Sequence, residues 1–378
     1  MSEANILVGD VRQRLSDIAD GSVQCCVTSP PYWGLRDYGT AIWEGGDLSC
    51  DHSTARSRGD DIKHGDKQGT SAGSRPNTQR TCATCGATRV DSQIGLEQTP
   101  DAYVAEMVGV FREVWRVLAD DGVLWLNLGD TYSSHKDCKS IAQTLALGGS
   151  SEMASVIEKG KSVSRDSRML KSQGFKNKEL IGIPWRVAFA LQADGWYLRQ
   201  DIIWAKPNPM PESVTDRCTK SHEYVFMLTK SARYYFDNEA IKEPSANLGT
   251  TKIKFGGTKY GDSDDPKHAT KSGNEYTDNG TRNKRDVWTI NTKPFKGAHF
   301  AVMPEALVEP CVLSSTRPDD LVLDPFTGSG TVAVVALKHG RNFVGVELNP
   351  EYAEIAKKRI ESSQPMFNEV IVDFVTPL

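Results

Sequence analysis

Short apolar runs alternate with amphipathic segments along most of the chain, and three long polar stretches interrupt them. Buried parallel strands are continuous apolar runs, whereas amphipathic helices carry apolar residues three and four positions apart. By these patterns we expect helices at 99–118, 183–193, 304–313, 331–339 and 350–360. We expect strands at 5–8, 22–28, 123–128, 197–204, 224–228, 234–236, 321–323, 343–346 and 370–375.

Strand and helix alternate most regularly between residues 321 and 375. A strand, a helix, a strand, a helix and a strand follow one another there with short connections. Parallel strands that are joined through helices form a doubly wound sheet. The sequence therefore predicts an α/β fold, with the polar stretch at 44–97 as an insertion and two further polar stretches at 133–178 and 239–294.

The composition is that of a globular protein: of 378 residues, 38% are hydrophobic and 25% are charged. Apolar runs of membrane-spanning length and a secretory signal pattern are both absent from the sequence, so we expect a cytoplasmic protein. The net charge is −4, yet 133–180 holds nine Lys and Arg against five Asp and Glu, and 242–296 holds eleven against seven. These basic stretches either bind phosphate groups or are ordinary solvated loops.

A glycine-rich turn follows one of the strands near the C-terminus. It runs from Asp324 through Gly328 to Gly330, and a helix is expected from Thr331. Glycines let the backbone approach a ligand, and ligands of open α/β sheets bind beyond the carboxyl ends of the strands. An acid, Glu347, ends the next strand and can accept both hydroxyls of a ribose. The turn lacks the GxGxxG pattern and the lysine of a P-loop, which excludes both of those sites.

A second motif, TSPPYW, occupies Thr28 to Trp33 and follows the apolar strand at 22–28. Its two prolines fix the backbone and offer no N–H donors. By itself the motif is either a rigid turn at the end of a strand or a catalytic loop.

Together the two motifs resemble those of the bacterial amino-DNA-methyltransferases, and the resemblance covers most of the chain. SPPY precedes the glycine-rich turn, which is the order of the permuted β group of that family. The resemblance implies a Rossmann-like fold that binds S-adenosylmethionine. The residues that it assigns to this cofactor are Asp10, Thr28, Phe300, Pro304, Asp324, Pro325, Phe326, Gly328, Ser329, Gly330, Thr331, Glu347 and Asn349.

The resemblance assigns catalysis to Ser29, Pro30, Pro31 and Tyr32, and the chemistry of an exocyclic amine explains these residue types. Such an amine is a poor nucleophile because its lone pair is conjugated with the ring. The Ser29 hydroxyl and the Pro30 carbonyl are suited to hold its two hydrogens and aim the lone pair at the methyl group. Tyr32 can stack on a base that is flipped out of the duplex.

The target base stays open at this point. Serine before Pro-Pro-Tyr is the pattern commonly linked to cytosine N4, but the link is loose, and adenine N6 is the more widespread product of the family. Both amines offer the same two hydrogens to Ser29 and Pro30. Adenine is slightly preferred because it is the more frequent target base in the family. No residue of this chain favours it.

On this basis the chain has five parts. They are the first catalytic part at 1–43, the insertion at 44–97, the middle catalytic part at 98–238 with a mobile basic stretch at 133–180, a target-recognition region at 239–297, and the cofactor-binding part at 298–378.

The partner that the resemblance implies is double-stranded DNA. We expect Asn283, Lys284 and Arg285 to contact it, because these side chains suit phosphates and base edges. Permuted enzymes of the family are often dimers, so we expect a homodimer. The expected setting is restriction-modification, or an orphan enzyme, in a bacterium or a phage.

The insertion carries the pattern of a metal site. Cys50-Asp-His52 and Cys82-Ala-Thr-Cys85 supply four ligands, and the glycine that follows permits the tight turn of a zinc knuckle. A structural zinc ion would order a segment this polar. Free thiols are the alternative, because the CxH half and the long gap between the halves are unusual. Four protein ligands leave no open position for catalysis.

Three other classes of function compete with this interpretation. A cytosine-C5 methyltransferase needs a nucleophilic cysteine, and the one Pro-Cys pair, Pro310-Cys311, lies within an expected helix. An RNA or protein amide methyltransferase can use a related PPY loop. A non-enzymatic zinc-containing DNA-binding protein would keep the basic stretches and the cysteines but has no use for the two motifs.

Overall fold

The computed structural model describes residues 2–34, 40–47, 49–52, 81–82, 84–133, 173–245, 253–254, 275–276, 280–293, 302–363 and 369–374. The chain divides into two compact units. The first comprises Met1–Pro30, Met107–Asp130 and Gly182–Leu378, and the second comprises Pro31–Glu106 and Thr131–Ile181.

A nine-stranded sheet forms the centre of the first unit, in the order β12-β6-β7-β5-β2-β13-β14-β1-β15. All neighbouring strands are parallel except that β7 runs antiparallel to both β5 and β6. The strands are β1 (Glu3–Val8), β2 (Val23–Thr28), β5 (Leu118–Leu128), β6 (Tyr197–Ala205), β7 (His222–Thr229), β12 (Val287–Thr289), β13 (Leu321–Asp324), β14 (Asn342–Glu347) and β15 (Glu369–Phe374).

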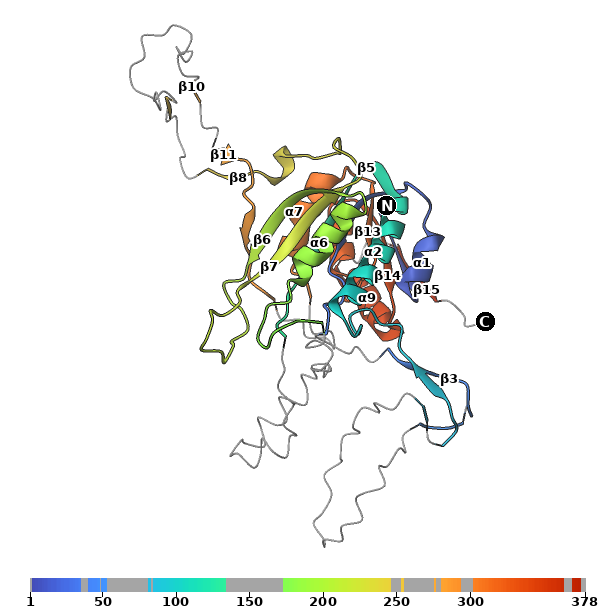
Figure 1. Cartoon of the computed structure of the whole chain (residues 1–378). Helices are drawn as coiled ribbons and strands as arrows, with labels where there is room; N and C mark the ends of the chain where they lie inside the picture. Colours follow the sequence, from blue (N-terminus) through green and yellow to red (C-terminus); the bar gives the residue numbers. More distant parts are fainter. Residues whose placement is uncertain are drawn as a thin grey trace, which may run out of the picture. The chain divides into compact units, whose positions relative to one another are not determined.

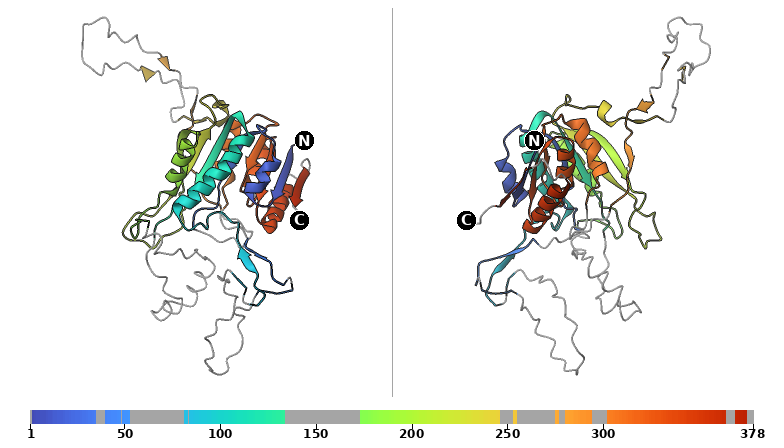
Figure 2. Two further views of the ribbon diagram at one scale, coloured as in Figure 1. Left: turned by 45° about the vertical axis from the view of Figure 1, so that its right-hand side comes forward. Right: turned by 180° about the vertical axis from the view of Figure 1, so that it is seen from behind.

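Helices cover both faces of this sheet. Helices α2 and α6 lie on one face (Figures 1 and 2), and α7 and α9 lie on the other, as the view from behind shows (Figure 2). The helices are α1 (Val11–Arg14), α2 (Pro100–Val117), α6 (Ile183–Ala193), α7 (Glu305–Ser315), α8 (Thr331–Lys338) and α9 (Pro350–Ser363), with 3-10 turns η1 (Leu15–Asp17) and η2 (Glu239–Ile241). Strands buried on both faces require continuous apolar runs, and β2 and β13 supply them.

Three antiparallel pairs stand outside the large sheet. In the second unit, β3 (Ile42–Glu44) pairs with β4 (Thr88–Val90). In the first unit, β8 (Glu243–Pro244) pairs with β11 (Thr281–Arg282), and β9 (Ile253–Lys254) pairs with β10 (Glu275–Tyr276).

The predicted doubly wound α/β fold is confirmed, with three local differences. First, β5 begins at Leu118 rather than at residue 123. Gly122 lies inside this strand. A side chain would clash there, because a Cβ would lie 2.7 Å from Leu118 Cγ and 3.0 Å from the carbonyl oxygen of Gln24. The glycine therefore permits a close approach to β2.

Second, the strand predicted at 234–236 is wrong. Tyr234 packs on the core as a partly buried side chain, whereas Phe236 is exposed, and the segment forms no strand. Third, β12 lies inside the predicted recognition region, yet it pairs with β6 at the edge of the large sheet. Among the described residues, no helix is long and apolar enough to cross a membrane.

Candidate active site

The carboxyl ends of β2, β13 and β14 carry the polar side chains of the candidate cofactor site. These strands are neighbours in the sheet, and they end at Thr28, Asp324 and Glu347. The Thr28 hydroxyl donates to Asp324 Oδ1 at 2.7 Å, and both side chains are buried. The start of the SPPY motif is therefore tied directly to the start of the glycine-rich turn.

The turn wraps around the carboxylate of Glu347. Gly328 N donates to one carboxylate oxygen at 2.8 Å, and Asn349 N donates to the other at 2.8 Å. Gly328 and Gly330 have φ of 51° and 75°, the left-handed region that favours glycine. A Cβ on Gly330 would also lie 3.1 Å from Ala356 Cβ on α9. The motif residues thus build a tight cradle of main-chain groups around an acid.

Burial raises the pKa of both acids in this site. The pKa of Asp324 rises to about 7, mainly through desolvation and further through the nearby Glu347. The pKa of Glu347 also rises to about 7 through desolvation, although N–H donors oppose the rise. Two carboxyl groups with raised pKa values beside a cradle of N–H donors suit a ligand that brings hydroxyl donors or positive charge.

Two further candidate cofactor residues, Asp10 and Pro304, belong to the described part of the first unit. Gly9 N donates to the carbonyl oxygen of Glu347 at 2.9 Å, which brings the turn with Asp10 to the same edge. Asp10 caps α1 and forms an ion pair with Arg12 at 2.6 Å. Pro304 is buried at the start of α7. Phe300 lies outside the described residues.

Two residues that the sequence did not single out support the turn. Arg359 on α9 donates from Nη1 to Ser329 Oγ at 3.0 Å and to Thr331 Oγ1 at 2.8 Å. Gly345 in β14 lies directly beneath it, because a Cβ there would lie 2.1 Å from Thr327 Oγ1. Neither residue belongs to a motif, so only the three-dimensional packing shows its role.

The SPPY motif spans the division between the two units. Ser29 and Pro30 follow β2 in the first unit, and Pro31 and Tyr32 begin the second. Within the second unit, the Tyr103 hydroxyl donates to the carbonyl oxygen of Pro31 at 3.0 Å. The indole of Trp33, which is buried, donates to the carbonyl oxygen of Glu97 at 2.8 Å.

A partly buried polar cluster that the sequence did not assign lies at the same edge of the sheet. The Asn127 amide in β5 donates to Glu223 Oε2 at 3.3 Å and to the carbonyl oxygen of Tyr224 at 3.0 Å. Glu223 also pairs with Lys206, whose ammonium group lies 4.1 Å from the centroid of the Trp204 ring. Asn127 and Thr28 together line a small cavity beside the end of β2.

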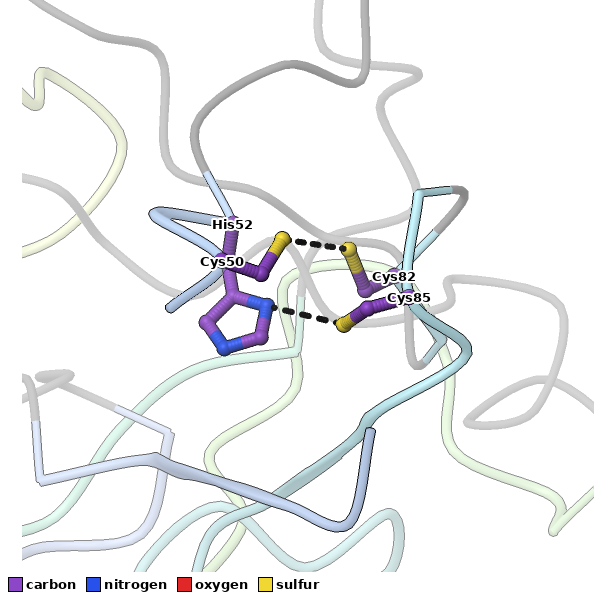
Figure 3. A group of neighbouring side chains, drawn as sticks. All are labelled: Cys50, His52, Cys82 and Cys85. Carbon is purple, nitrogen blue, oxygen red and sulfur yellow. Dashed lines mark hydrogen bonds between the residues drawn. The ribbon is translucent and has the colours of Figure 1, made fainter. Parts of the chain in front are cut away.

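The four candidate metal ligands lie together in the second unit (Figure 3). Their ligand atoms all fall within 4.8 Å of one another. Cys50 Sγ is 3.8 Å from Cys82 Sγ, and Cys85 Sγ is 3.5 Å from His52 Nδ1. The pKa of Cys82 falls to about 6, because His52 and then the N–H groups of Cys85 and Thr84 favour its thiolate. A low thiol pKa suits a metal ligand, which must be deprotonated.

The candidate DNA-binding residues lie between β11 and β12 at the edge of the first unit. Arg285 shares the Glu243 carboxylate with Arg282, at N–O distances of 2.5 and 2.8 Å. Asn238 donates to Asn283 Oδ1 at 2.9 Å, and the Lys284 ammonium group lies 5.1 Å from the centroid of the Trp288 ring. All three candidates are thus held by contacts within the chain.

The chain is similar to known DNA methyltransferases over most of its length. The N6_N4_Mtase family, described as DNA methylase, matches residues 23–358. The type II methyltransferase M.Cfr9I of Citrobacter freundii is 40% identical over 367 residues, which is 96% of this chain and 89% of that protein. M.SmaI of Serratia marcescens is 40% identical over 360 residues, 95% of this chain and 91% of that protein.

Solved structures share the fold. A putative DNA modification methylase of Thermus thermophilus, in complex with S-adenosyl-L-methionine, has a TM-score of 0.52 and 20% identity, covering 99% of this chain and 100% of that one. The PvuII DNA methyltransferase, which is cytosine-N4-specific, has a TM-score of 0.53 and 16% identity. The match covers 100% of this chain and 97% of that one. The chain therefore belongs to the N6/N4 family of S-adenosylmethionine-dependent DNA methyltransferases.

Proposed function

We propose that Ser29 and Pro30 hold the exocyclic amino group of a base while the turn from Asp324 to Thr331 holds S-adenosylmethionine. The observation that carries this proposal is the buried hydrogen bond between Thr28 and Asp324. It joins the last residue before the SPPY motif to the first residue of the glycine-rich turn. In this arrangement the amino group of the base and the methyl group that it accepts are held at the same edge of the sheet.

The cradle fits the cofactor by its chemistry. Glu347 offers a carboxylate to the ribose hydroxyls, and Gly328 leaves the backbone open to close approach. S-adenosylmethionine supplies an electrophilic methyl group on a sulfonium. The Ser29 hydroxyl and the Pro30 carbonyl accept the two amine hydrogens. When bound, the sulfonium would give its methyl group to the amine and leave as the thioether S-adenosylhomocysteine. Ser29 and Pro30 would hold the nitrogen while it releases one proton to solvent.

A covalent route through cysteine does not fit this site. Cys311 is buried within α7, where its thiol donates to the carbonyl oxygen of Leu307 at 3.3 Å. Burial raises its pKa well above the usual range, so it is not a thiolate at neutral pH. This observation argues against the cytosine-C5 class of mechanism.

We propose cytosine N4 as the target amine, because Ser29 is the residue of this chain that bears on the choice. The PvuII enzyme is cytosine-N4-specific, but at 16% identity it supports only the fold. The frequency that favoured adenine concerns other members of the family. Nucleoside analysis of DNA methylated by the purified enzyme should yield N4-methylcytosine. Recovery of N6-methyladenine instead would refute the base, and recovery of neither would refute amine methylation.

We propose that the arm with Asn283, Lys284 and Arg285 contacts DNA. Arg285 is well exposed, with 65% of its side chain accessible, and it shares Glu243 with Arg282. Arg282 can therefore keep Glu243 paired when Arg285 turns to a phosphate.

We further propose a homodimer in which the second subunit adds backbone contacts. Light scattering should give twice the mass of one chain, and a monomeric mass on DNA would refute the dimer.

Charge reversal at Lys284 and Arg285 should weaken DNA binding and flatten its salt dependence. Each lost phosphate contact reduces the slope of log K against log salt by roughly 0.9, so the double variant should lose about 1.8. Titration of labelled duplex at several salt concentrations measures both quantities. Charge reversal at Lys357 and Lys358 on α9 is the matched control. If both double variants keep the parent's slope, the arm does not bind DNA.

We propose that Cys50, His52, Cys82 and Cys85 hold one structural zinc ion. Zinc ligands at about 2.0–2.3 Å in a tetrahedron lie about 3.3–3.8 Å apart. The distances of 3.8 Å between Cys50 and Cys82 and 3.5 Å between Cys85 and His52 match this spacing. A disulfide would instead bring two sulfur atoms to about 2.05 Å.

Metal analysis of the protein purified without chelator should therefore find one zinc ion per chain. The ion should be lost when Cys82 and Cys85 are both replaced by serine. Replacement of Cys218, an exposed cysteine outside the cluster, should leave the zinc in place. Zinc-free parent protein, or a double variant that retains the ion, would show that the cluster does not bind it.

A further inference from the structure

We infer that the hairpin of β3 and β4, which carries the cluster of Cys50, His52, Cys82 and Cys85, supports the catalytic loop. Trp33 and Glu97 are the residues that position the loop. This inference rests on the proposed roles of the SPPY motif and of the zinc cluster. It assigns to the metal an effect on turnover, although the metal holds no substrate.

The hairpin begins and ends at the catalytic loop. Pro31 and Tyr32 lead into β3, and β4 leads back to the segment 91–97. Gly34 N donates to the carbonyl oxygen of Gly95 at 2.7 Å, and the Trp33 indole donates to that of Glu97 at 2.8 Å. The returning segment therefore lies directly against the residues that follow Tyr32.

Close packing fixes this contact. Gly95 has φ of 99°, and a Cβ there would lie 3.2 Å from the carbonyl oxygen of Tyr32 and 3.3 Å from that of Pro31. The Glu97 carboxylate accepts from Gly95 N at 2.9 Å, which holds the turn shut. Trp33 is 1% exposed, so its indole is a rigid buried anchor. Main-chain atoms of the catalytic loop thus rest on main-chain atoms of the returning segment.

The metal cluster closes the opposite end of the same hairpin. Ile42 pairs with Val90 and Glu44 with Thr88, and Cys50 and His52 lie beyond one strand while Cys82 and Cys85 lie before the other.

Side-chain contacts reinforce both ends of the hairpin. The Trp43 ring stacks on His52 with centroids 4.7 Å apart. Towards the catalytic loop, Thr40 donates to Asp91 at 3.0 Å. Two short strands rarely hold together alone in water, so the register of the returning segment depends on the ligands at the closed end.

Single-turnover methylation at saturating DNA and cofactor tests the anchor. Trp33→Phe keeps the ring but removes the donor to Glu97, and we expect the rate to fall about 10-fold, since small misplacements of reacting groups are costly. Trp196→Phe is the matched control, because it makes the same substitution at a buried position whose indole N–H has no hydrogen-bond partner among the described residues. Its rate should stay near the parent's. Cofactor affinity, measured by calorimetry, should stay within about twofold in both.

Zinc removal tests the coupling. Enzyme stripped of zinc by a chelator should show the same fall in single-turnover rate as Trp33→Phe. Addition of Zn²⁺ should restore the parent rate, and cofactor affinity should stay unchanged throughout. Parent-like rates in Trp33→Phe, or in zinc-stripped protein, would overturn the inference. A parent enzyme that methylates no amine would instead overturn the proposed function, so the two failures are distinguishable. Loss of cofactor affinity in Trp33→Phe or in zinc-stripped enzyme would assign these groups to general folding and also overturn the inference.

Discussion

Ser29→Ala is expected to slow methyl transfer by at least about 10²-fold while S-adenosylmethionine binding survives. The variant loses one of the two acceptors that hold the amine, and loss of a single preorganised polar group in an active site costs about 10²–10³-fold. Cofactor binding should persist because Thr28, the neighbouring residue, keeps its hydrogen bond to Asp324. Single-turnover rates and calorimetry on the same preparation measure the two effects.

Tyr32→Ala should reduce turnover by a similar factor for a different reason. Stacking of an aromatic ring on one base contributes about 1–3 kcal/mol, and its loss leaves the flipped base poorly held. Tyr32→Phe is the control, because it keeps the ring. Near-parent turnover in both Ser29→Ala and Tyr32→Ala would remove the catalytic assignment of the motif. Loss of cofactor binding in either variant would mean that the change disturbs the fold instead.

The sequence predicted the strand ends well because polar motifs follow buried apolar runs. Thr28, Asp324 and Glu347 each end such a run, and parallel strands bring their carboxyl ends to one edge. The direction of a strand is a different matter. An apolar run reads the same in either direction, so the reversal of β7 could not be predicted. The three-residue strand β12 lies in a polar stretch and gave no signal.

Long-range packing accounts for the site residues that the sequence missed. Arg359 contacts Ser329 and Thr331 from a separate helix, and Gly345 is required because Thr327 lies directly above it. Neither constraint is visible in local spacing. The Cys50–His52 and Cys82–Cys85 patterns are short and local, so the grouping of these four side chains could be predicted even though the gap between the patterns is long.

Glu347→Gln should weaken S-adenosylmethionine binding by about 10²-fold. An ionised carboxylate gains about 1.5–3 kcal/mol from each hydrogen bond, and two ribose hydroxyls are expected to donate here. The amide also places N–H groups against Gly328 N or Asn349 N, which now donate to the carboxylate. Calorimetry measures the loss. Glu361→Gln makes the same change at an exposed position on α9; it is the control for charge and should bind like the parent.

The carboxyl group of Glu347 should also make cofactor binding depend on pH. Its pKa is about 7 in the folded chain against an ordinary 4.5, so the folded chain binds more protons between these values and loses stability as pH rises across them. Hydroxyl donors favour the ionised form, so S-adenosylmethionine should bind more tightly as pH rises towards 7 and should release protons. Through Glu347 alone, affinity should fall by up to about tenfold per pH unit below 7 in the parent, which is about 1.36 kcal/mol per unit. In Glu347→Gln this dependence should shrink to the part due to Asp324, whose pKa is also about 7. An equal pH dependence in parent and variant would show that Glu347 does not meet the ribose as a carboxylate.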